Sequence, residues 1–136
     1  MPDAQSKTIN FINPPELSAP PGYSHVAEIR GGRIVYIAGQ VALDRQGKLV
    51  GKGDFEAQAD QVFRNLTAAL AAVGCTPGNI AKLTIFMRDA NQLASFRKAR
   101  DRFLGGLTPP ASTLVEISRL AMEDFLIEIE AVAVAN

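Results

Sequence analysis

The segment from Asp54 to Val73 constrains the fold most, because its pattern predicts a long amphipathic helix. Its apolar side chains recur at steps of three and four residues, which places them on one stripe of a helix: Phe55, Ala59, Val62, Leu66, Ala69, Leu70 and Val73. Asp54 is a good N-cap, Glu56 lies in the positive first turn, and Gly74 favours a left-handed end. A helix of this length is about 30 Å long, enough to cross a small sheet.

Shorter elements surround this helix. A second amphipathic helix is predicted from Asn91 to Phe103, where Gly105 and Gly106 end it. Runs of β-prone residues bounded by Gly and Pro predict extended segments at Val26–Arg30, Arg33–Ala38, Val41–Val50, Ile80–Arg88, Ala111–Ser118 and Leu126–Val134. Gly31 and Gly32 predict a hairpin between the first two. The proline-rich residues 1–24 predict an irregular arm.

The order β-β-α-β-α-β-β predicts an α/β (α+β) fold in which two helices cover one face of a mixed sheet. The 136 residues correspond to about one domain. Fourteen Lys and Arg balance 14 Asp and Glu, which argues against nucleic acid as a partner. One cysteine and one histidine exclude an internal disulfide and a structural zinc site. The chain shows no secretory leader and no membrane span, so we expect a cytoplasmic protein.

The last predicted strand has two different faces. One face carries Ile127, Ile129, Ala131 and Ala133, which we expect to lie under the helices. The other face carries Leu126, Glu128, Glu130, Val132 and Val134. Two helices can cover only one face of a sheet, and an uncovered apolar face usually meets a partner. This pattern predicts a homo-oligomer.

Carboxylates are the strongest candidates for chemistry. Glu128 and Glu130 share a face about 7 Å apart, and Glu116 belongs to the neighbouring strand. Carboxylates with apolar neighbours suit proton transfer. The alternative is that these glutamates form ion pairs with arginines across a subunit boundary.

Other reactive residues lack a supporting pattern. His25 has no Gly-x-Ser-x-Gly elbow or second histidine to work with, which favours a non-catalytic role. Cys75 follows the negative end of a helix, so we expect an unreactive thiol. Residues 51–54 (Gly-Lys-Gly-Asp) lack the spacing of a phosphate-binding loop and predict an ordinary turn and helix cap.

Five motifs occur in series along the chain. They are Ile37-Ala38-Gly39-Gln40-Val41, Gln58 with Asn65-Leu66, Lys82-Leu83-Thr84-Ile85-Phe86, Pro109-Pro110-Ala111 leading into Val115-Glu116, and Ile127-Glu128-Ile129-Glu130-Ala131. Together they resemble the RidA family, also called YjgF and formerly endoribonuclease L-PSP, from Tyr23 to Val134. The resemblance implies a chorismate-mutase-like fold, one RidA-like domain over residues 1–136, and a homotrimer with its sites in clefts between subunits.

The resemblance also implies an activity. RidA is an enamine/imine deaminase that hydrolyses reactive 2-imino acids to 2-keto acids and ammonia, without a cofactor or metal. By the same resemblance, Tyr23 is the site tyrosine, Gly39 packs beside the ligand, and Glu128 positions the attacking water. Leu114 stands where the family uses backbone groups.

The chain departs from the family at three positions. Ser112 replaces the arginine that binds the substrate carboxylate, Ala38 replaces a serine, and Arg97 stands where an asparagine is expected. Arg97 is a candidate replacement cation, although a helix arginine is more often solvated. We therefore expect an imine or enamine deaminase with an altered substrate. The alternative is a non-catalytic homotrimer that binds a small metabolite in its clefts; zero net charge and a single histidine disfavour a ribonuclease or translation inhibitor.

Overall fold

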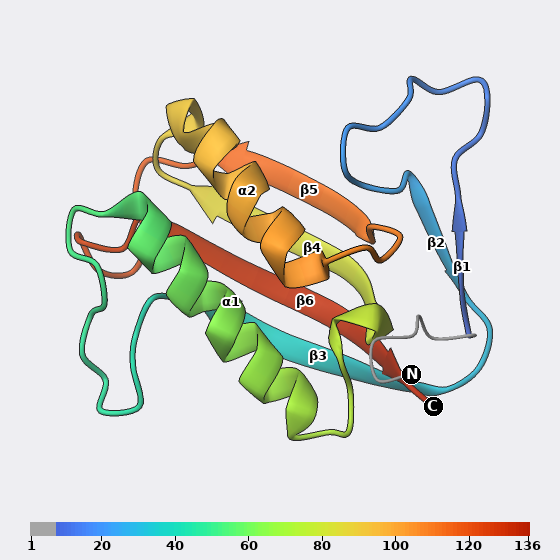
Figure 1. Ribbon diagram of the computed structural model, residues 1–136, viewed down its shortest axis with the longest axis horizontal. Helices are drawn as coiled ribbons and strands as arrows, with labels where there is room; N and C mark the ends of the chain where they lie inside the picture. Colours follow the sequence, from blue (N-terminus) through green and yellow to red (C-terminus); the bar gives the residue numbers. More distant parts are fainter. Residues whose placement is uncertain (1–7) are drawn as a thin grey trace.

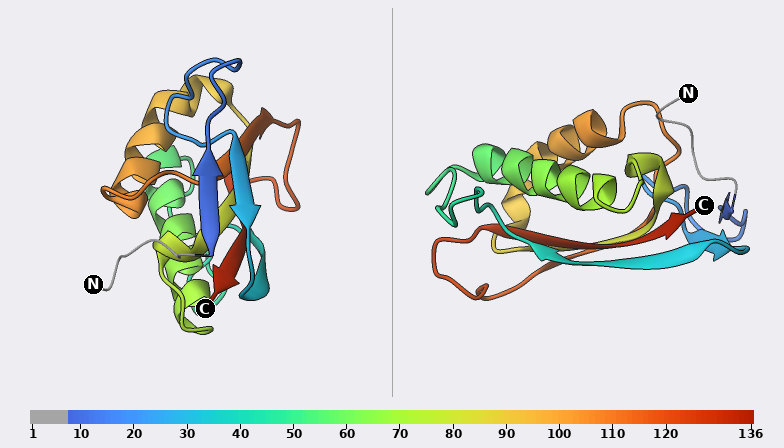
Figure 2. Two further views of the ribbon diagram at one scale, coloured as in Figure 1. Left: turned by 90° about the vertical axis from the view of Figure 1, so that its right-hand side faces the viewer. Right: turned by 90° about the horizontal axis from the view of Figure 1, so that it is seen from below.

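The computed structural model describes residues 8–136, and in it two helices cover one face of a four-stranded sheet (Figures 1 and 2). The strand order is β3-β6-β4-β5, in which β4 and β5 are parallel and the other pairs antiparallel. A separate pair, β1-β2, lies at one end of this sheet. The bounds are β1 Ile9–Ile12, β2 Val26–Ile29, β3 Arg33–Gln40, α1 Phe55–Ala71, η1 Pro77–Asn79, β4 Ile80–Met87, η2 Ala90–Gln92, α2 Leu93–Leu104, β5 Ala111–Glu116 and β6 Ile127–Ala135. The predicted α+β class is confirmed.

Helix α1 forms as its sequence predicts. The Asp54 side chain accepts a hydrogen bond from the Ala57 amide at 3.1 Å, which caps the helix. At the other end Gly74 takes a φ of 73°, and the Cys75 amide donates to the Leu70 carbonyl at 2.9 Å. The apolar stripe packs on the sheet and forms the centre of the core.

Strand β6 alternates as predicted, with two corrections on its outer side. Its four helix-side residues are all buried in the core: Ile127, Ile129, Ala131 and Ala133. Leu126, however, precedes the strand and packs against this same core, because its amide is bound to α1. Val134 is fully buried rather than open, since Ile9 of β1 and Ala81 cover it.

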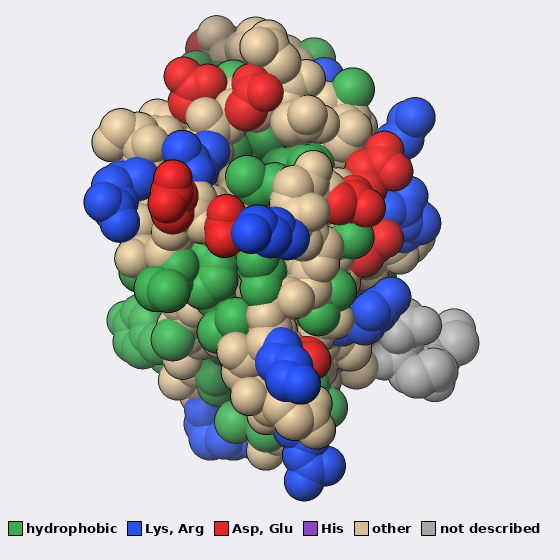
Figure 3. Space-filling view, turned by 90° about the vertical axis from the view of Figure 1, so that its left-hand side faces the viewer, with side chains coloured by type: hydrophobic (Ala, Val, Ile, Leu, Met, Phe, Trp, Pro, Cys, Tyr) green, Lys and Arg blue, Asp and Glu red, His purple; other side chains and the backbone are tan. Residues whose placement is uncertain are grey.

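The sheet face opposite the helices is nevertheless uncovered and apolar. Tyr36 is 82% exposed there and pairs with Val132, while Ile34 and Val115 are also exposed. Figure 3 shows hydrophobic side chains gathered at the lower left of the view, on the side of this face. The predicted open apolar face is therefore present, although Tyr36, Ile34 and Val115 form much of it.

The predicted N-terminal organisation is wrong in two respects. The arm, predicted to be irregular, contains β1, which pairs antiparallel with β2; residues 1–7 of the arm lie outside the described part. The predicted hairpin across Gly31 and Gly32 does not form, because β3 pairs with β6 instead. The two glycines, with φ of 84° and 85°, redirect the chain from one sheet to the other. Burial of Ile9 against Val134 provides the packing that favours this arrangement.

The remaining elements follow the prediction within a few residues. Helix α2 begins at Leu93, after the short turn η2, and ends at Gly105, whose φ is 61°. The extended segment predicted at Val41–Val50 is an exception, because it forms no strand: a single bridge joins Leu43 and Leu49. The turn expected around residues 45–47 is present between them, where the Gly47 amide donates to the Asp44 carbonyl at 3.0 Å. Within residues 8–136, neither helix has the length and apolar character needed to cross a membrane.

Candidate functional site

Glu128 and Gly39 are in direct contact on the uncovered side of the sheet. Glu128 pairs with Phe86 of β4. Between Ile37 and Gln40 the register of β3 shifts by one residue, a bulge that brings Gly39 against β6. A Cβ atom placed on Gly39 would overlap the Glu128 carboxylate, so only glycine permits this approach.

The Glu128 carboxylate is free to act on a ligand within this chain. It is half-buried, and within residues 8–136 no hydrogen bond or ion pair holds it. By contrast, Glu116 accepts a hydrogen bond from the Ala90 amide at 2.9 Å and thereby caps η2. Glu130 is exposed. Of the three glutamates, Glu128 is therefore the one that combines partial burial with an unoccupied carboxylate.

Gln58 of α1 fixes the segment that leads into Glu128. Its side chain is fully buried, and its Oε1 accepts from the Leu126 amide at 2.9 Å. Its Nε2 donates to the carbonyls of Asp124 at 2.9 Å and Gly51 at 3.1 Å. The chain two residues before Glu128 is thus bound to the helix.

Asn65 does the same for the segment that follows Gly39. Its Nδ2 donates to the carbonyls of Val41 and Leu43, each at 3.0 Å, while its Oδ1 accepts from Gln61 at 2.9 Å. Both sides of the contact between Gly39 and Glu128 are therefore attached to α1. The sequence analysis named both residues only as part of a motif, and the available signal for their roles was a polar side chain on or beside the apolar stripe of the helix.

Tyr23 lies at a different place, beside the start of β5. The next residue, Ser24, donates through its amide to Pro110 O at 3.0 Å and through its hydroxyl to Pro109 O at 2.6 Å, and it forms a parallel bridge with Ala111. The Tyr23 ring meets the His25 ring edge-on, with 5.3 Å between centroids. His25 in turn contacts the Ser18 carbonyl at 2.7 Å, so it supports this loop.

Ser112 and Leu114 face the helices rather than Glu128. In β5 they are opposite Leu83 and Ile85, two buried core residues, and Leu114 packs against the core. Ala111 pairs with Lys82, whereas Glu128 pairs with Phe86, one strand further across the sheet. Ala111 and Glu128 are therefore four residues apart along the strands and two strand spacings apart across the sheet, which gives a separation of about 16 Å.

The residues predicted for one site therefore form two groups within the chain. Glu128 and Gly39 make one group, and Tyr23, Ser112 and Leu114 lie near β5 in the other. Arg97 is exposed on α2 and has no interaction with another residue of the described part of the chain.

Arg100 is a residue that sequence reasoning missed. Its side chain is only 11% exposed, and its guanidinium lies against Gly22, next to Tyr23: a Cβ on Gly22 would be 2.6 Å from Cζ. Phe96 lies on its other side, with 5.9 Å from Cζ to the ring centroid. A signal was present, because Arg100 follows Phe96 by four residues and so continues the inner stripe of α2.

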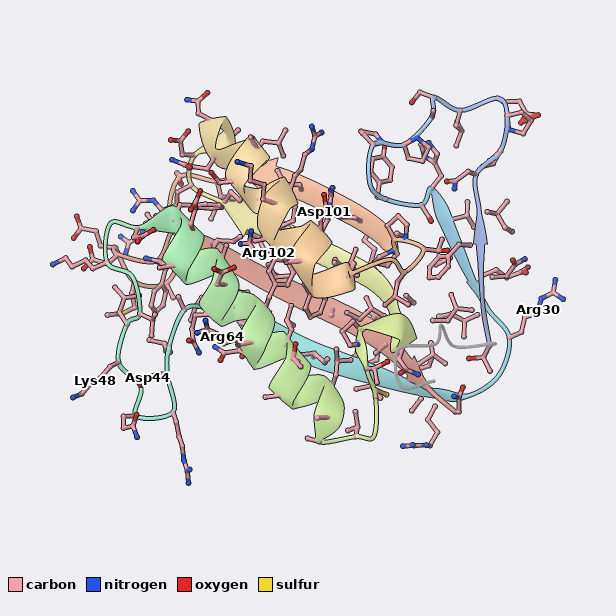
Figure 4. The ribbon with its side chains drawn as sticks, in the orientation of Figure 1. Arg30, Asp44, Lys48, Arg64, Asp101 and Arg102 are labelled. Carbon is pink, nitrogen blue, oxygen red and sulfur yellow. The ribbon has the colours of Figure 1, made fainter. Side chains whose placement is uncertain are left out.

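The outer surface of the helices, away from Glu128 and Tyr23, has a hollow and an ion pair. A shallow hollow of about 330 Å³ lies between α1 and α2, where Arg64 and Arg102 project (Figure 4). Arg102 bonds Asp60 at 2.8 Å, and this hydrogen bond raises the pKa of Arg102 above its ordinary value. Among residues 8–136 there is no group of three or more His, Cys, Asp and Glu side chains that could hold a metal ion.

Comparison with known proteins identifies relatives along nearly the whole chain. The model of the family Endoribonuclease L-PSP matches residues 15–135. A RutC family protein of Synechocystis is 38% identical over 128 residues, which cover 93% of this chain and 97% of that protein. A 2-iminobutanoate/2-iminopropanoate deaminase of Salmonella typhimurium is 36% identical over 131 residues, covering 95% and 98% of the two chains.

The fold leads to the same relatives. The crystal structure of a Rid family protein of unknown function from Yersinia pestis superimposes with a TM-score of 0.87 and 35% sequence identity, covering 93% of this chain and 98% of that one. The fold predicted from the resemblance is thus confirmed. The chain, with its bulged glycine beside a free glutamate, belongs to the RidA/YjgF family, whose family model bears the older name Endoribonuclease L-PSP.

Proposed function

We propose that this protein hydrolyses reactive imines to a carbonyl compound and ammonia, R₂C=NH + H₂O → R₂C=O + NH₃. The observation that carries the proposal is the contact between Gly39 and the half-buried Glu128 carboxylate, which has no partner among residues 8–136. The deaminase of Salmonella typhimurium, 36% identical, supports the reaction class.

In this reaction Glu128 acts as the general base. Its carboxylate accepts a proton from a water molecule as the water oxygen forms a bond to the imine carbon, and it then passes that proton to the nitrogen, which gives the carbinolamine R₂C(OH)NH₂ and regenerates the carboxylate. In the second step the carboxylate accepts the hydroxyl proton and passes it to the nitrogen, while the C–N bond breaks, the C=O bond forms and ammonia leaves. Gly39, which has no side chain, leaves room for the carboxylate itself and so fixes where the base lies.

We propose further that the complete site needs two copies of the chain, within a homotrimer. Tyr23 is held beside Ala111, about 16 Å from Glu128, so one chain does not surround a small ligand with both. The uncovered apolar face around Tyr36 supports association with another copy. Light scattering with size-exclusion chromatography tests the trimer directly, and a monomer at micromolar concentration would refute it.

Ser112 is the reason to expect a substrate different from that of the named deaminases. A neutral hydroxyl provides one hydrogen bond where a guanidinium provides two charge-assisted bonds to a carboxylate. Losing such a pair costs about 2–5 kcal/mol of binding. We infer that simple 2-imino acids bind weakly here unless another cation replaces the missing one.

The decisive experiment compares Glu128→Gln with Glu130→Gln. Both glutamates lie on the same strand and face, but Glu130 is exposed and does not contact Gly39. Ammonia release from a panel of imines is expected to fall at least about 100-fold in Glu128→Gln, within the usual contribution of a general base, and to stay unchanged in Glu130→Gln. Equal rates for wild type and Glu128→Gln would refute the proposal.

A second candidate is a non-catalytic trimer that binds a small metabolite in the same clefts. Ser112 favours it, because a family member without the carboxylate-binding arginine has lost part of its polar binding set. Thermal-shift screening separates the two: binding alone predicts ligands that raise the melting temperature and are recovered unchanged.

A further inference from the structure

We propose that Arg100 is the cation that binds the carboxylate group of this protein's ligand, in place of an arginine at position 112. The inference rests on the proposed function. It specifies the substrate class as a small 2-imino acid or a similar compound that carries a carboxylate beside its C=N group.

The Arg100 side chain is largely buried, but the counter-ion that it contacts is exposed. The Arg100 side chain is 11% exposed, yet its carboxylate partner within residues 8–136 is the neighbouring Asp101, which is 68% exposed and is labelled in Figure 4. Asp101 Oδ1 engages Nε at 3.1 Å and Nη2 at 3.0 Å. A buried charge is costly unless it is paired, so a second, better enclosed anion would complete this site.

The remaining nitrogen, Nη1, is available to a ligand. Within residues 8–136 it has no hydrogen-bond partner. Every side-chain nitrogen and oxygen sealed from solvent in this part of the chain has a partner, so the unpaired Nη1 is not sealed from solvent. It faces the segment of Tyr23, since a Cβ on Gly22 would lie 2.8 Å from it.

The guanidinium also has neighbours from two segments of the chain. Its Cζ lies 5.9 Å from the centroid of the Phe96 ring, and the backbone of Gly22, with a φ of 92°, lies against it. A side chain at position 22 would collide with the guanidinium, so glycine is needed for this contact. A planar guanidinium held between such neighbours loses little freedom on binding, which suits two-pronged recognition of a carboxylate.

Arg100 is on the same side of the molecule as the group formed by Tyr23, Ser112 and Leu114. Ser24, two residues after Gly22, bridges Ala111 at the start of β5. Ser112 follows; it pairs with Leu83 of the core, so its side chain is on the side of the sheet that the helices cover (Figure 2). The carboxylate of 2-iminobutanoate or 2-iminopropanoate, the compounds for which the Salmonella typhimurium relative is named, is the group that this cation would meet.

The kinetic test uses two substrates that differ in the carboxylate. These are 2-iminobutanoate and the imine of butanone, both generated in solution and followed by ammonia release. For Arg100→Gln we expect KM for 2-iminobutanoate to rise about 10- to 100-fold, with the butanone imine unaffected. Arg100→Lys should recover part of the loss, and Arg64→Gln, an exposed arginine of α1, should match wild type.

A binding test separates this inference from the proposed function. The product 2-oxobutanoate is expected to raise the melting temperature of the wild type, butanone to have no effect, and Arg100→Gln to abolish the shift. If no imine is hydrolysed but this pattern holds, the carboxylate site stands and the proposed enzyme activity fails. If imines are hydrolysed and Arg100→Gln leaves KM for 2-iminobutanoate unchanged, or if Arg97→Gln raises it instead, the assignment of Arg100 is wrong. If Arg100→Gln does not fold, two other variants test the assignment: Gly22→Ala, which displaces the guanidinium, and Arg100→Lys. Both are measured by KM for 2-iminobutanoate and by the melting-temperature shift with 2-oxobutanoate.

Discussion

Replacing Gln58 by leucine should destabilise the protein and loosen the segment before Glu128. The substitution keeps a similar volume on α1 but removes three hydrogen bonds. The Leu126 amide would lose its partner in a half-buried position, which costs about 1–3 kcal/mol. The carbonyls of Asp124 and Gly51 belong to exposed and half-exposed residues, where water can replace the lost donor, at about 0.5–1 kcal/mol each.

Additional apolar burial of the leucine offsets about 1 kcal/mol of these losses. The net effect is a loss of about 1–4 kcal/mol in the free energy of unfolding, a large fraction of the 5–15 kcal/mol typical of a domain. Urea denaturation followed by circular dichroism, at one fixed protein concentration, measures it as a shift of the midpoint by about 1 M.

Gln61→Leu is the matched control on the same helix. Gln61 donates to Asn65 Oδ1 at 2.9 Å and reaches the Leu43 carbonyl only at 3.5 Å, but it is half-buried, so water can replace these partners and we expect a loss of about 1 kcal/mol or less. If Gln58→Leu shifts the midpoint no more than Gln61→Leu does, the buried amide does not stabilise this segment and the reasoning is refuted.

Two further predictions concern Gly39 and Cys75. Gly39→Ala places a methyl group where the Glu128 carboxylate lies, and since that carboxylate is the flexible end of a side chain, we expect it to move; ammonia release should fall at least about 10-fold while the urea midpoint changes little, and unchanged activity would contradict the assigned contact. Burial raises the pKa of the Cys75 thiol above its ordinary 9.0, with Arg33 acting weakly in the opposite direction, so the folded state holds the proton more tightly than the unfolded chain. The stabilisation is complete below pH 9 and declines as the pH rises beyond it; the unfolding free energy of wild type should therefore fall more steeply between pH 9 and 10.5 than that of Cys75→Ala, and parallel curves would show that the thiol does not contribute.

Local patterns in the sequence were sufficient where neighbouring residues determine the structure. The caps at Asp54 and Gly74 and the apolar stripe between them define α1 without reference to the rest of the chain. The alternation of β6 predicts its core face, because burial there depends only on which side the helices cover. The bulge that brings Gly39 to Glu128 was not predictable, since it is a property of the register between two strands far apart in sequence.

Long-range packing decided the elements that the sequence did not predict. The hairpin expected around Gly31 and Gly32 competes with pairing of β1 to β2, and burial of Ile9 over Val134 favours the latter. The role of Arg100 was not predicted, because a charged residue among the inward-facing apolar residues of a helix is normally interpreted as a break in the apolar pattern. Its role depends on the approach of Gly22, a loop 78 positions earlier in the chain.

The attachment of two loops to one helix has a consequence for how such a site changes over time. Gln58 and Asn65 attach the segments before Glu128 and after Gly39 to a single helix, whereas Tyr23 is held separately, beside the start of β5. Under the proposed function, a substitution near Tyr23, such as serine at position 112, can change which ligands bind while Glu128 keeps its position. This division permits a new specificity to arise without a change in the segments that position the proposed base.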